Sequence, residues 1–427
     1  MIHSMFNSRL LQLLVICVPL CDAARILGIA PFDSSSHSIV MSSLFKELAN
    51  RGHQMTVYTV KPLKHVPSNY SQITIDIKQK YSGGRENFFE ILYDMSALAL
   101  MGFMWSISSE MATTLLESPD LKKLLHSSND KFDLFITESF FNDALLGFSH
   151  KFDVPFVCVV AFSGTEGFKD SVGNPFPYSY VPNPFFNYND NMTFFQRLHN
   201  TITNFLTKVG HNLYYIPAQD AVMRKYFTNV PNLPPLADII HNTSLLLLNT
   251  HFSHEFPRPN VPNLIEVGGM HVKPSKKLPQ DIQKYLDDAK DGVVYFSMGS
   301  NLKSSNIDVD KREALLNAFA KLKQRVMWKF EENLPRIPQN VKIYKWLPQS
   351  DILGHPNVRV FMTHGGLLST QEAMYNAVPL VGVPIFGDQI LNVFRAVEIG
   401  YALQLDYHNI TEESVYWTLN EVVTNPK

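Results

Sequence analysis

The stretch from residue 359 to residue 372 combines residue types and spacings that suit binding of a phosphorylated ligand. A predicted strand over 359–363 is followed at once by His364, Gly365 and Gly366, and a helix is expected to begin near Ser369. Glycine lets a ligand approach the backbone closely, and the first turn of a helix offers unpaired N–H groups at its positive end. His364 can add a hydrogen bond. The pattern therefore predicts a site for a diphosphate.

Other side chains in this half have simple structural explanations when they are taken one by one. Ser369 and Glu372 match the S-x-x-E capping box that begins many helices. Trp346 alone is more typical of a core residue than of a platform on which a base stacks, and Asp388 with Gln389 alone is a polar pair after a strand. Their order is more informative, because each follows a predicted strand, and open parallel sheets bind ligands at the carboxyl ends of their strands. One nucleotide sugar could therefore contact them all.

Two sets of alternating strands and helices are expected to position these residues. In the second half the apolar runs predict a helix over 311–323 and strands over 293–297, 326–330, 342–344, 359–363 and 380–383. The first half begins with a βαβ unit, which has no G-x-G-x-x-G motif and consists of a strand over 25–30, a loop over 31–37, a helix from 40 to Gly52 and a strand over 55–60. The fold class is therefore α/β, with two doubly wound Rossmann-like domains facing each other across a cleft.

The chain also divides by composition. Residues 1–23 contain Arg9, an apolar run over 10–20 and small residues before Ala24, which is typical of a cleaved signal peptide. Residues 24–250 then form the first domain, the proline-rich range 251–285 a linker, and residues 286–427 the second domain. The apolar run over 97–105 is too short to span a bilayer and is predicted to be a buried or interfacial helix.

Charge, cysteines and glycosylation sequons limit the class of protein. A net charge of -2 gives no reason to expect nucleic acid as a partner. Cys158 is the one cysteine outside the predicted signal peptide, which excludes an internal disulfide framework and a metal site built from cysteines. N-x-S/T sequons agree weakly with the secretory pathway and occur at Asn69, Asn191, Asn242 and Asn409. We expect a protein that enters the secretory pathway.

The region from Trp346 to Asn392 resembles the nucleotide-binding signature of the UDP-glycosyltransferase family, and the similarity is closest to animal enzymes of the invertebrate type. The phrase over 267–271 and the loop around His37 belong to the same pattern. The resemblance implies the GT-B arrangement of two Rossmann-like domains, a UDP-sugar donor and a small lipophilic acceptor. It implies neither a metal nor a cofactor, since the UDP-sugar is a co-substrate.

The resemblance also implies a role for each donor-site residue. Trp346 would stack on uracil, Gln349 would bind its edge, and Glu372 would accept hydrogen bonds from the ribose. The diphosphate would be held by His364, Gly366, Ser369, Ser297, Gly299 and Ser300. Asp388 and Gln389 would bind hydroxyls of the transferred sugar, and Asn392 would support the phosphate side.

Catalysis is assigned by the same resemblance to the first half of the chain. His37 alone would be read as an ordinary loop histidine, one of 15 in the chain. The family places its general base in this loop, so His37 is expected to deprotonate the acceptor hydroxyl. An acidic residue, usually Asp, orients that base; Glu138 occupies the position here, and Asp143 is the fallback. The acceptor is expected to bind near residues 178–186.

Two departures from the family pattern leave alternatives open. Ala377 replaces a glycine at a helix end, with Asn376 beside it to share the left-handed geometry. The chain ends at Lys427, whereas the family continues into a membrane-spanning segment, so a truncated, lumenal or secreted form is expected. The leading hypothesis is an inverting transferase that moves a hexose, preferably glucose rather than glucuronate. The alternatives are a non-catalytic protein that binds lipophilic ligands or UDP-sugars, and a UDP-sugar epimerase.

Overall fold

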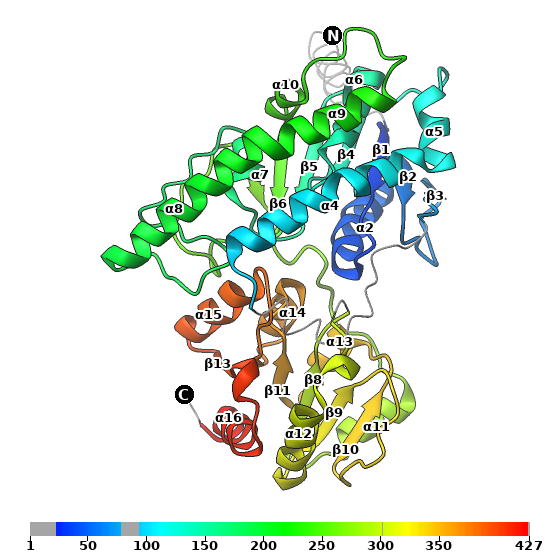
Figure 1. Ribbon diagram of the computed structural model, residues 1–427. Helices are drawn as coiled ribbons and strands as arrows, with labels where there is room; N and C mark the ends of the chain where they lie inside the picture. The colour runs from blue at the N-terminus through cyan, green and yellow to red at the C-terminus, as the bar shows by residue number, and fades with distance from the viewer. Residues whose placement is uncertain (1–22, 78–93, 301, 426–427) are drawn as a thin grey trace, which may run out of the picture.

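The computed structural model describes residues 23–77, 94–300 and 302–425, so the predicted signal peptide lies almost wholly outside the described residues. Two parallel sheets, one in each half of the chain, form the centres of two stacked α/β domains (Figure 1). The two-sheet α/β fold expected from the alternating apolar runs is confirmed.

The first sheet has seven strands in the order β3-β2-β1-β4-β5-β6-β7. The strands are β1 (Arg25–Ala30), β2 (Gln54–Thr59), β3 (Tyr70–Thr74), β4 (Leu134–Glu138), β5 (Phe156–Val160), β6 (Leu245–Leu248) and β7 (Leu264–Glu266). Alternate residues of β1 enter two cores: Leu27 and Ile29 pack with the helices on one face, and Ile26 and Ala30 with α2 on the other. Burial on both faces explains the continuous apolar runs in the sequence.

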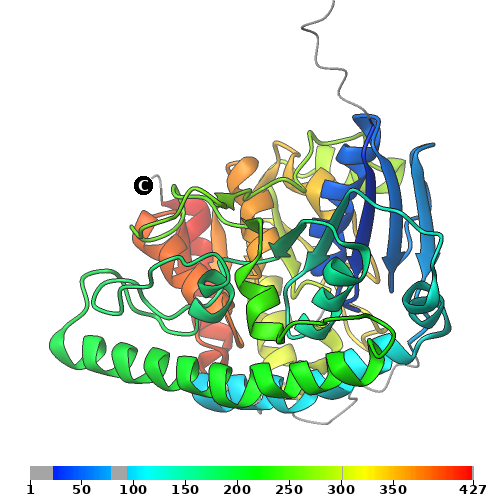
Figure 2. The ribbon, with the colours of Figure 1, turned by 90° about the horizontal axis from the view of Figure 1, so that it is seen from above.

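The helices of the first domain are α2 (Ser35–Asn50), α4 (Ala97–Glu117), α5 (Pro119–His126), α6 (Gly147–Phe152), α7 (Glu166–Asp170), α8 (Phe194–Gly210), α9 (Ile216–Tyr226) and α10 (Leu236–His241), with short turns η1 (Asp143–Leu146) and η2 (His211–Tyr215). Figure 2 shows the long helix α8 along one side of the molecule with α4 beside it. Helix α8 is amphipathic in the reverse sense: its buried residues are polar, as in Asn200 and Asn204, whereas Phe195 and Phe205 are exposed. No helix among the described residues is both long and apolar enough to cross a bilayer.

The second sheet has six strands in the order β10-β9-β8-β11-β12-β13. The strands are β8 (Val293–Ser297), β9 (Arg325–Lys329), β10 (Val341–Tyr344), β11 (Val358–Thr363), β12 (Leu380–Gly382) and β13 (Ala402–Gln404). The helices are α11 (Gln280–Asp287), α12 (Val309–Lys321), α13 (Gln349–Leu353), α14 (Leu367–Tyr375), α15 (Gln389–Ile399) and α16 (Glu412–Thr424), with turns η3 (Ser304–Asn306) and η4 (Tyr407–Asn409).

Two local predictions are corrected by this arrangement. The helix predicted from residue 40 begins at Ser35, so His37 lies in the first turn of α2 instead of a loop. The range 251–285, predicted as a linker, contains β7, which pairs with β6 and completes the first sheet, and most of α11. Strand β7 has three residues, too few for a recognisable periodicity.

Candidate active site

The candidate residues lie where the strand order of each sheet reverses, so that successive strands are added on opposite sides of this point. In the first sheet β1 and β4 are neighbours, with helices leaving toward opposite sides, and His37 follows β1 while Glu138 ends β4. In the second sheet β8 and β11 are neighbours, and Ser297 pairs with Thr363 just before their two loops begin. Ligands of doubly wound sheets bind at such switch points. The two switch points face one cleft.

The cleft between the domains has a volume of about 680 Å³. Its walls contain all but two of the residues expected from the sequence, namely His37, Ser297, Gly299, Ser300, Trp346, Gln349, His364, Gly366, Ser369, Glu372, Asp388 and Gln389. Glu138 and Asn392 lie behind this lining, each in contact with a residue that forms it. The tertiary structure therefore gathers residues from 37 to 392 around one space large enough for a nucleotide sugar and an acceptor.

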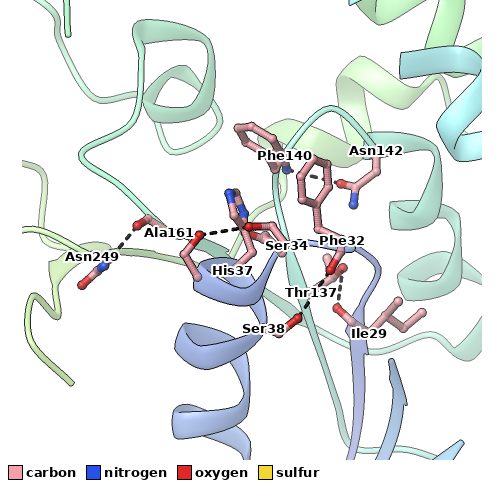
Figure 3. Close-up of polar contacts among 12 residues, drawn as sticks. Ile29, Phe32, Ser34, His37, Ser38, Thr137, Phe140, Asn142, Ala161 and Asn249 are labelled. Carbon is pink, nitrogen blue, oxygen red and sulfur yellow. Dashed lines mark hydrogen bonds and ion pairs between the residues drawn. The ribbon is translucent and has the colours of Figure 1, made fainter. Parts of the chain in front are cut away.

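His37 is held by one carboxylate and two aromatic rings. Its Nδ1 is hydrogen-bonded to Oε1 of Glu138, which is only 1% exposed. The rings of Phe32 and Phe140 lie 4.8 and 4.7 Å from the imidazole centroid (Figure 3). With Nδ1 donating to the carboxylate, Nε2 is the atom left to accept a proton. Asp143, the fallback partner, instead accepts hydrogen bonds from Tyr215 and Ser139.

His364 is enclosed by the two glycine loops of the second domain. A Cβ atom built on Gly299 or on Gly366 would lie 2.5 Å from the imidazole ring, so both glycines make room for this side chain. Gly365 adopts a φ of +78° and packs against Val393 of α15. Burial, and secondarily the charge of Lys329, lowers the pKa of His364 to about 4. At neutral pH the ring is therefore uncharged and can donate one hydrogen bond.

Lys329 is a site residue that the sequence reasoning missed. It ends β9 and lines the cleft, where its Nζ donates to the carbonyl oxygen of Gly299 at 2.9 Å and pairs with Glu331 at 2.7 Å. Among the described residues that line the cleft, Lys329 is the only lysine or arginine. The available signal was its place at the carboxyl end of a predicted strand.

The side chains expected to bind the nucleoside form a hydrogen-bonded group beside an exposed ring. Trp346 is 72% exposed, so the alternative of a core tryptophan is wrong. Nε2 of Gln349 donates to Glu372 at 2.7 Å and to Ser369 at 3.0 Å. Helix α14 begins at Leu367 with Gly366 as its N-cap, so Ser369 is not a cap and the capping-box alternative is also wrong. Burial raises the pKa of Glu372.

The first turn of α15 presents the acidic end of the cleft. Asp388 is held by Nδ2 of Asn392 at 3.0 Å, and the same amide group donates to the carbonyl oxygen of Gly365 at 3.1 Å. Oε1 of Gln389 accepts the backbone N–H groups of residues 385 and 386, at 3.0 and 3.3 Å. Its NH₂ group is thus the part of Gln389 that can donate to a ligand. Burial raises the pKa of Asp388, and the hydrogen bond from Asn392 and, to a lesser extent, nearby His37 oppose this rise.

The opposite wall of the cleft is aromatic and sulfur-rich. Of the predicted acceptor region over 178–186, only Phe185 lies in the lining, and the OH group of Tyr178 donates to Glu166. The remainder comes from α4, from the loops after β4 and β5 and from α7, with Leu100, Met101, Met104, Phe140, Phe141, Phe162 and Phe168. The predicted helix over 97–105 thus contributes a wall of the site.

Ala377 has the left-handed backbone expected of the glycine that it replaces. Its φ is +53°, whereas Asn376 has a φ of −94° and does not share the strain. The N–H of Ala377 donates to the carbonyl oxygen of Met374 at the end of α14. Ala377 is not among the residues that line the cleft.

Two doubly wound domains whose switch points face a common cleft form the GT-B architecture of glycosyltransferases. A family model described as "UDP-glucoronosyl and UDP-glucosyl transferase" matches residues 25–427, and the chain belongs to this family. A UDP-glycosyltransferase named UGT5, from Dactylopius coccus, is 38% identical over 416 residues, which are 94% of this chain and 77% of the relative. The 2-hydroxyacylsphingosine 1-beta-galactosyltransferase of Rattus norvegicus is 32% identical, over 97% of this chain and 76% of its own. The protein is a UDP-glycosyltransferase.

Solved structures agree on the fold. The calicheamicin glycosyltransferase CalG4 aligns with a TM-score of 0.61 at 18% identity, over 94% of this chain and 90% of its own. UGT2 of Phytolacca americana, solved with UDP-2fluoro-glucose and pterostilbene, aligns with a TM-score of 0.60 at 18% identity, over 95% and 91% of the two chains. Among the described residues of the present chain, no group of three or more His, Cys, Asp or Glu side chains is arranged to hold a metal.

Proposed function

We propose that this enzyme transfers a neutral hexose, preferably glucose, from its UDP conjugate to a hydroxyl group of a small lipophilic acceptor, with inversion at the anomeric carbon. The observation on which the proposal depends is the pair of His37 and Glu138, which faces the donor residues of the second domain across the cleft. A base with a free Nε2 and a buried carboxylate behind it is the arrangement that general-base catalysis requires.

The donor nucleotide fits the second domain. The exposed ring of Trp346 can stack on uracil, and Glu372, already ordered by Gln349, can accept hydrogen bonds from the ribose. The diphosphate would lie between the N-terminus of α14, the imidazole of His364 and the ammonium group of Lys329. These groups would stabilise the charge that develops on the leaving UDP.

A neutral sugar suits the far end of the cleft better than a uronic acid. Asp388 and Gln389 can bind hydroxyl groups, and the carboxylate of Asp388 would repel a carboxylate on the sugar. Lys329, the cation that lines the cleft, donates a hydrogen bond to the carbonyl oxygen of Gly299 and lies near His364. It is therefore on the side of the cleft assigned to the phosphates. These positions favour glucose over glucuronate.

The reaction would be a single displacement. Nε2 of His37 accepts the proton of the acceptor hydroxyl while its oxygen forms a bond to the anomeric carbon. The bond from that carbon to the β-phosphate oxygen breaks, and UDP leaves with the electron pair. Glu138 stabilises the imidazolium that forms. The apolar wall of α4 and the phenylalanine loops would bind the acceptor and exclude water.

The proposal is tested by measuring UDP release from the wild-type enzyme with UDP-glucose or UDP-glucuronate, with and without a phenolic acceptor. Acceptor-dependent release that is faster with UDP-glucose is the expected result. His37→Ala should lower kcat by about 10²–10⁴-fold, while calorimetry shows an unchanged Kd for UDP. His126→Ala, an exposed histidine that ends α5, is the matched control. UDP release that does not depend on the acceptor, or wild-type kcat in His37→Ala, would overturn the proposal.

We also infer that the protein resides in the lumen of the endoplasmic reticulum. The sequon residues Asn191, Asn242 and Asn409 are exposed, as acceptors of N-linked glycans must be. A glycosidase that removes N-linked glycans should increase the electrophoretic mobility of the protein isolated from its own cells. Unchanged mobility would count against a lumenal location.

A further inference from the structure

Helix α15 joins the two domains through its second half. It begins with Gln389, directly after Asp388, and ends at Ile399. Figure 1 shows α15 beneath the first domain. Its first turn therefore faces the sugar end of the cleft, while its later turns meet residues 251–256, which follow β6. Any shift of α15 against the first domain would change the distance between the sugar-binding residues and His37.

Arg395 makes most of this contact. Its Nε donates to the carbonyl oxygen of His254 at 3.1 Å, and Nη2 donates to the carbonyl oxygen of Glu255 at 3.3 Å. The guanidinium also lies over the ring of Phe256, 4.5 Å from its centroid. A planar guanidinium can bind two consecutive carbonyl oxygens and a ring face together, whereas the single ammonium of lysine cannot.

The segment that Arg395 binds is itself fixed in the first domain. Oε1 of Glu255 accepts a hydrogen bond from Thr250, and Oε2 pairs with Arg258 at 2.8 Å. The backbone N–H groups of His254 and Glu255 both donate to the carbonyl oxygen of His251. A rigid segment offers its carbonyl oxygens in a fixed direction, so it can serve as a reference for the position of α15.

Neighbouring contacts support the same attachment. The OH group of Tyr401, just after α15, is hydrogen-bonded to Nδ1 of His254 at 3.1 Å, and Asn189 donates to Glu398 at 2.8 Å. Gln371 of α14 donates to the carbonyl oxygen of Asn249 at 3.4 Å. Both helices that begin at the donor site are thus attached to the strip of chain that follows β6.

We propose that Arg395 is a positioning residue for sugar transfer, which holds the start of α15, and with it Asp388, at the working distance from His37. The proposal rests on the proposed function, because it assigns His37 and Asp388 their parts in the reaction. The nucleotide site lies within the second domain alone, so loss of Arg395 should impair transfer without impairing UDP binding. A displacement of about 1 Å at a reacting centre can lower the rate about 10²-fold.

The test compares kcat with UDP-glucose and a phenolic acceptor against the Kd for UDP measured by calorimetry. Arg395→Ala should lower kcat about 10–100-fold and leave the Kd within about twofold; Arg395→Lys should fall between this variant and the wild type. Arg224→Ala, which removes an arginine paired with Asp220 inside α9, is the matched control and should leave both quantities unchanged. Wild-type kcat in Arg395→Ala, or loss of UDP affinity in proportion to kcat, would overturn the proposal.

Amide hydrogen exchange separates this proposal from the proposed function. Arg395→Ala should speed exchange in residues 251–256 and in α15, and not in the strands of either sheet. This measurement needs no turnover, so a wild-type enzyme without transferase activity would refute the proposed function and still leave the attachment of α15 to be judged. Unchanged exchange in both segments would refute the positioning role.

Discussion

Replacing Glu138 by glutamine keeps the length of the side chain and removes its charge, which makes it a direct test of the catalytic pair. The carboxylate is buried against Nδ1 of His37, and its other oxygen has no hydrogen-bond partner among the described residues. A hydrogen bond to a charged group contributes about 1.5–3 kcal/mol. That bond has its full strength when the imidazole is protonated in the transition state. Since about 1.4 kcal/mol corresponds to a factor of ten, kcat should fall about 10–150-fold.

The loss should not come from unfolding. Glu138 is 1% exposed, and exchanging a buried carboxylate for an amide of the same shape removes a charge that is costly to bury. The thermal midpoint of Glu138→Gln should therefore equal or exceed that of the wild type. UDP affinity should also be unchanged, because the donor residues belong to the other domain. UDP-release kinetics, calorimetry and thermal unfolding of the same preparation measure the three quantities.

A second variant distinguishes the effect of the charge of the Glu138 side chain from the effect of its length. Glu138→Asp keeps the charge and withdraws it by one carbon–carbon bond of about 1.5 Å, so its kcat should lie between those of the wild type and of Glu138→Gln. Wild-type kcat in Glu138→Gln would show that His37 acts without the carboxylate.

Trp346→Ala should raise the donor KM about 5–150-fold, since base stacking contributes about 1–3 kcal/mol, and a normal KM in steady-state assays would show that the exposed ring does not contact uracil. Burial lowers the pKa of His364 and of His271 to about 4. The stability that depends on their neutral forms should therefore be fully present above pH 6.5 and be lost as the pH falls toward 4. The free energy of unfolding should decrease over this range by up to about 1.4 kcal/mol per pH unit for each histidine. Urea denaturation at pH 7.5 and 5.5 measures this, and His271→Gln should reduce the slope; a flat dependence contradicts it. Ala377→Gly should raise the free energy of unfolding by about 1 kcal/mol, because it relieves the φ of +53° at an exposed position, and a lower denaturation midpoint would show that the alanine is not strained.

Local sequence was sufficient for the elements that position the site. Strands buried on both faces give continuous apolar runs, so β1, β8 and β11 could be placed within a residue or two of their bounds. Helix α8 could not, since its apolar face points outward and its asparagines point inward, the reverse of the pattern that identifies a helix in a globular domain. Strand β7 was too short to be recognised and depended on pairing with β6.

The sequence alone indicated which residues could bind a nucleotide sugar, because most of the donor residues lie between Trp346 and Asn392, in groups that each follow one strand. How these residues work together depends on the tertiary structure. Glu138 reaches His37 from 101 residues away, His364 fits between glycines from two loops, and Arg395 joins α15 to the other domain. These contacts join residues that are distant along the chain, so the packing of the sheets and of the two domains sets them, and no local pattern encodes that packing.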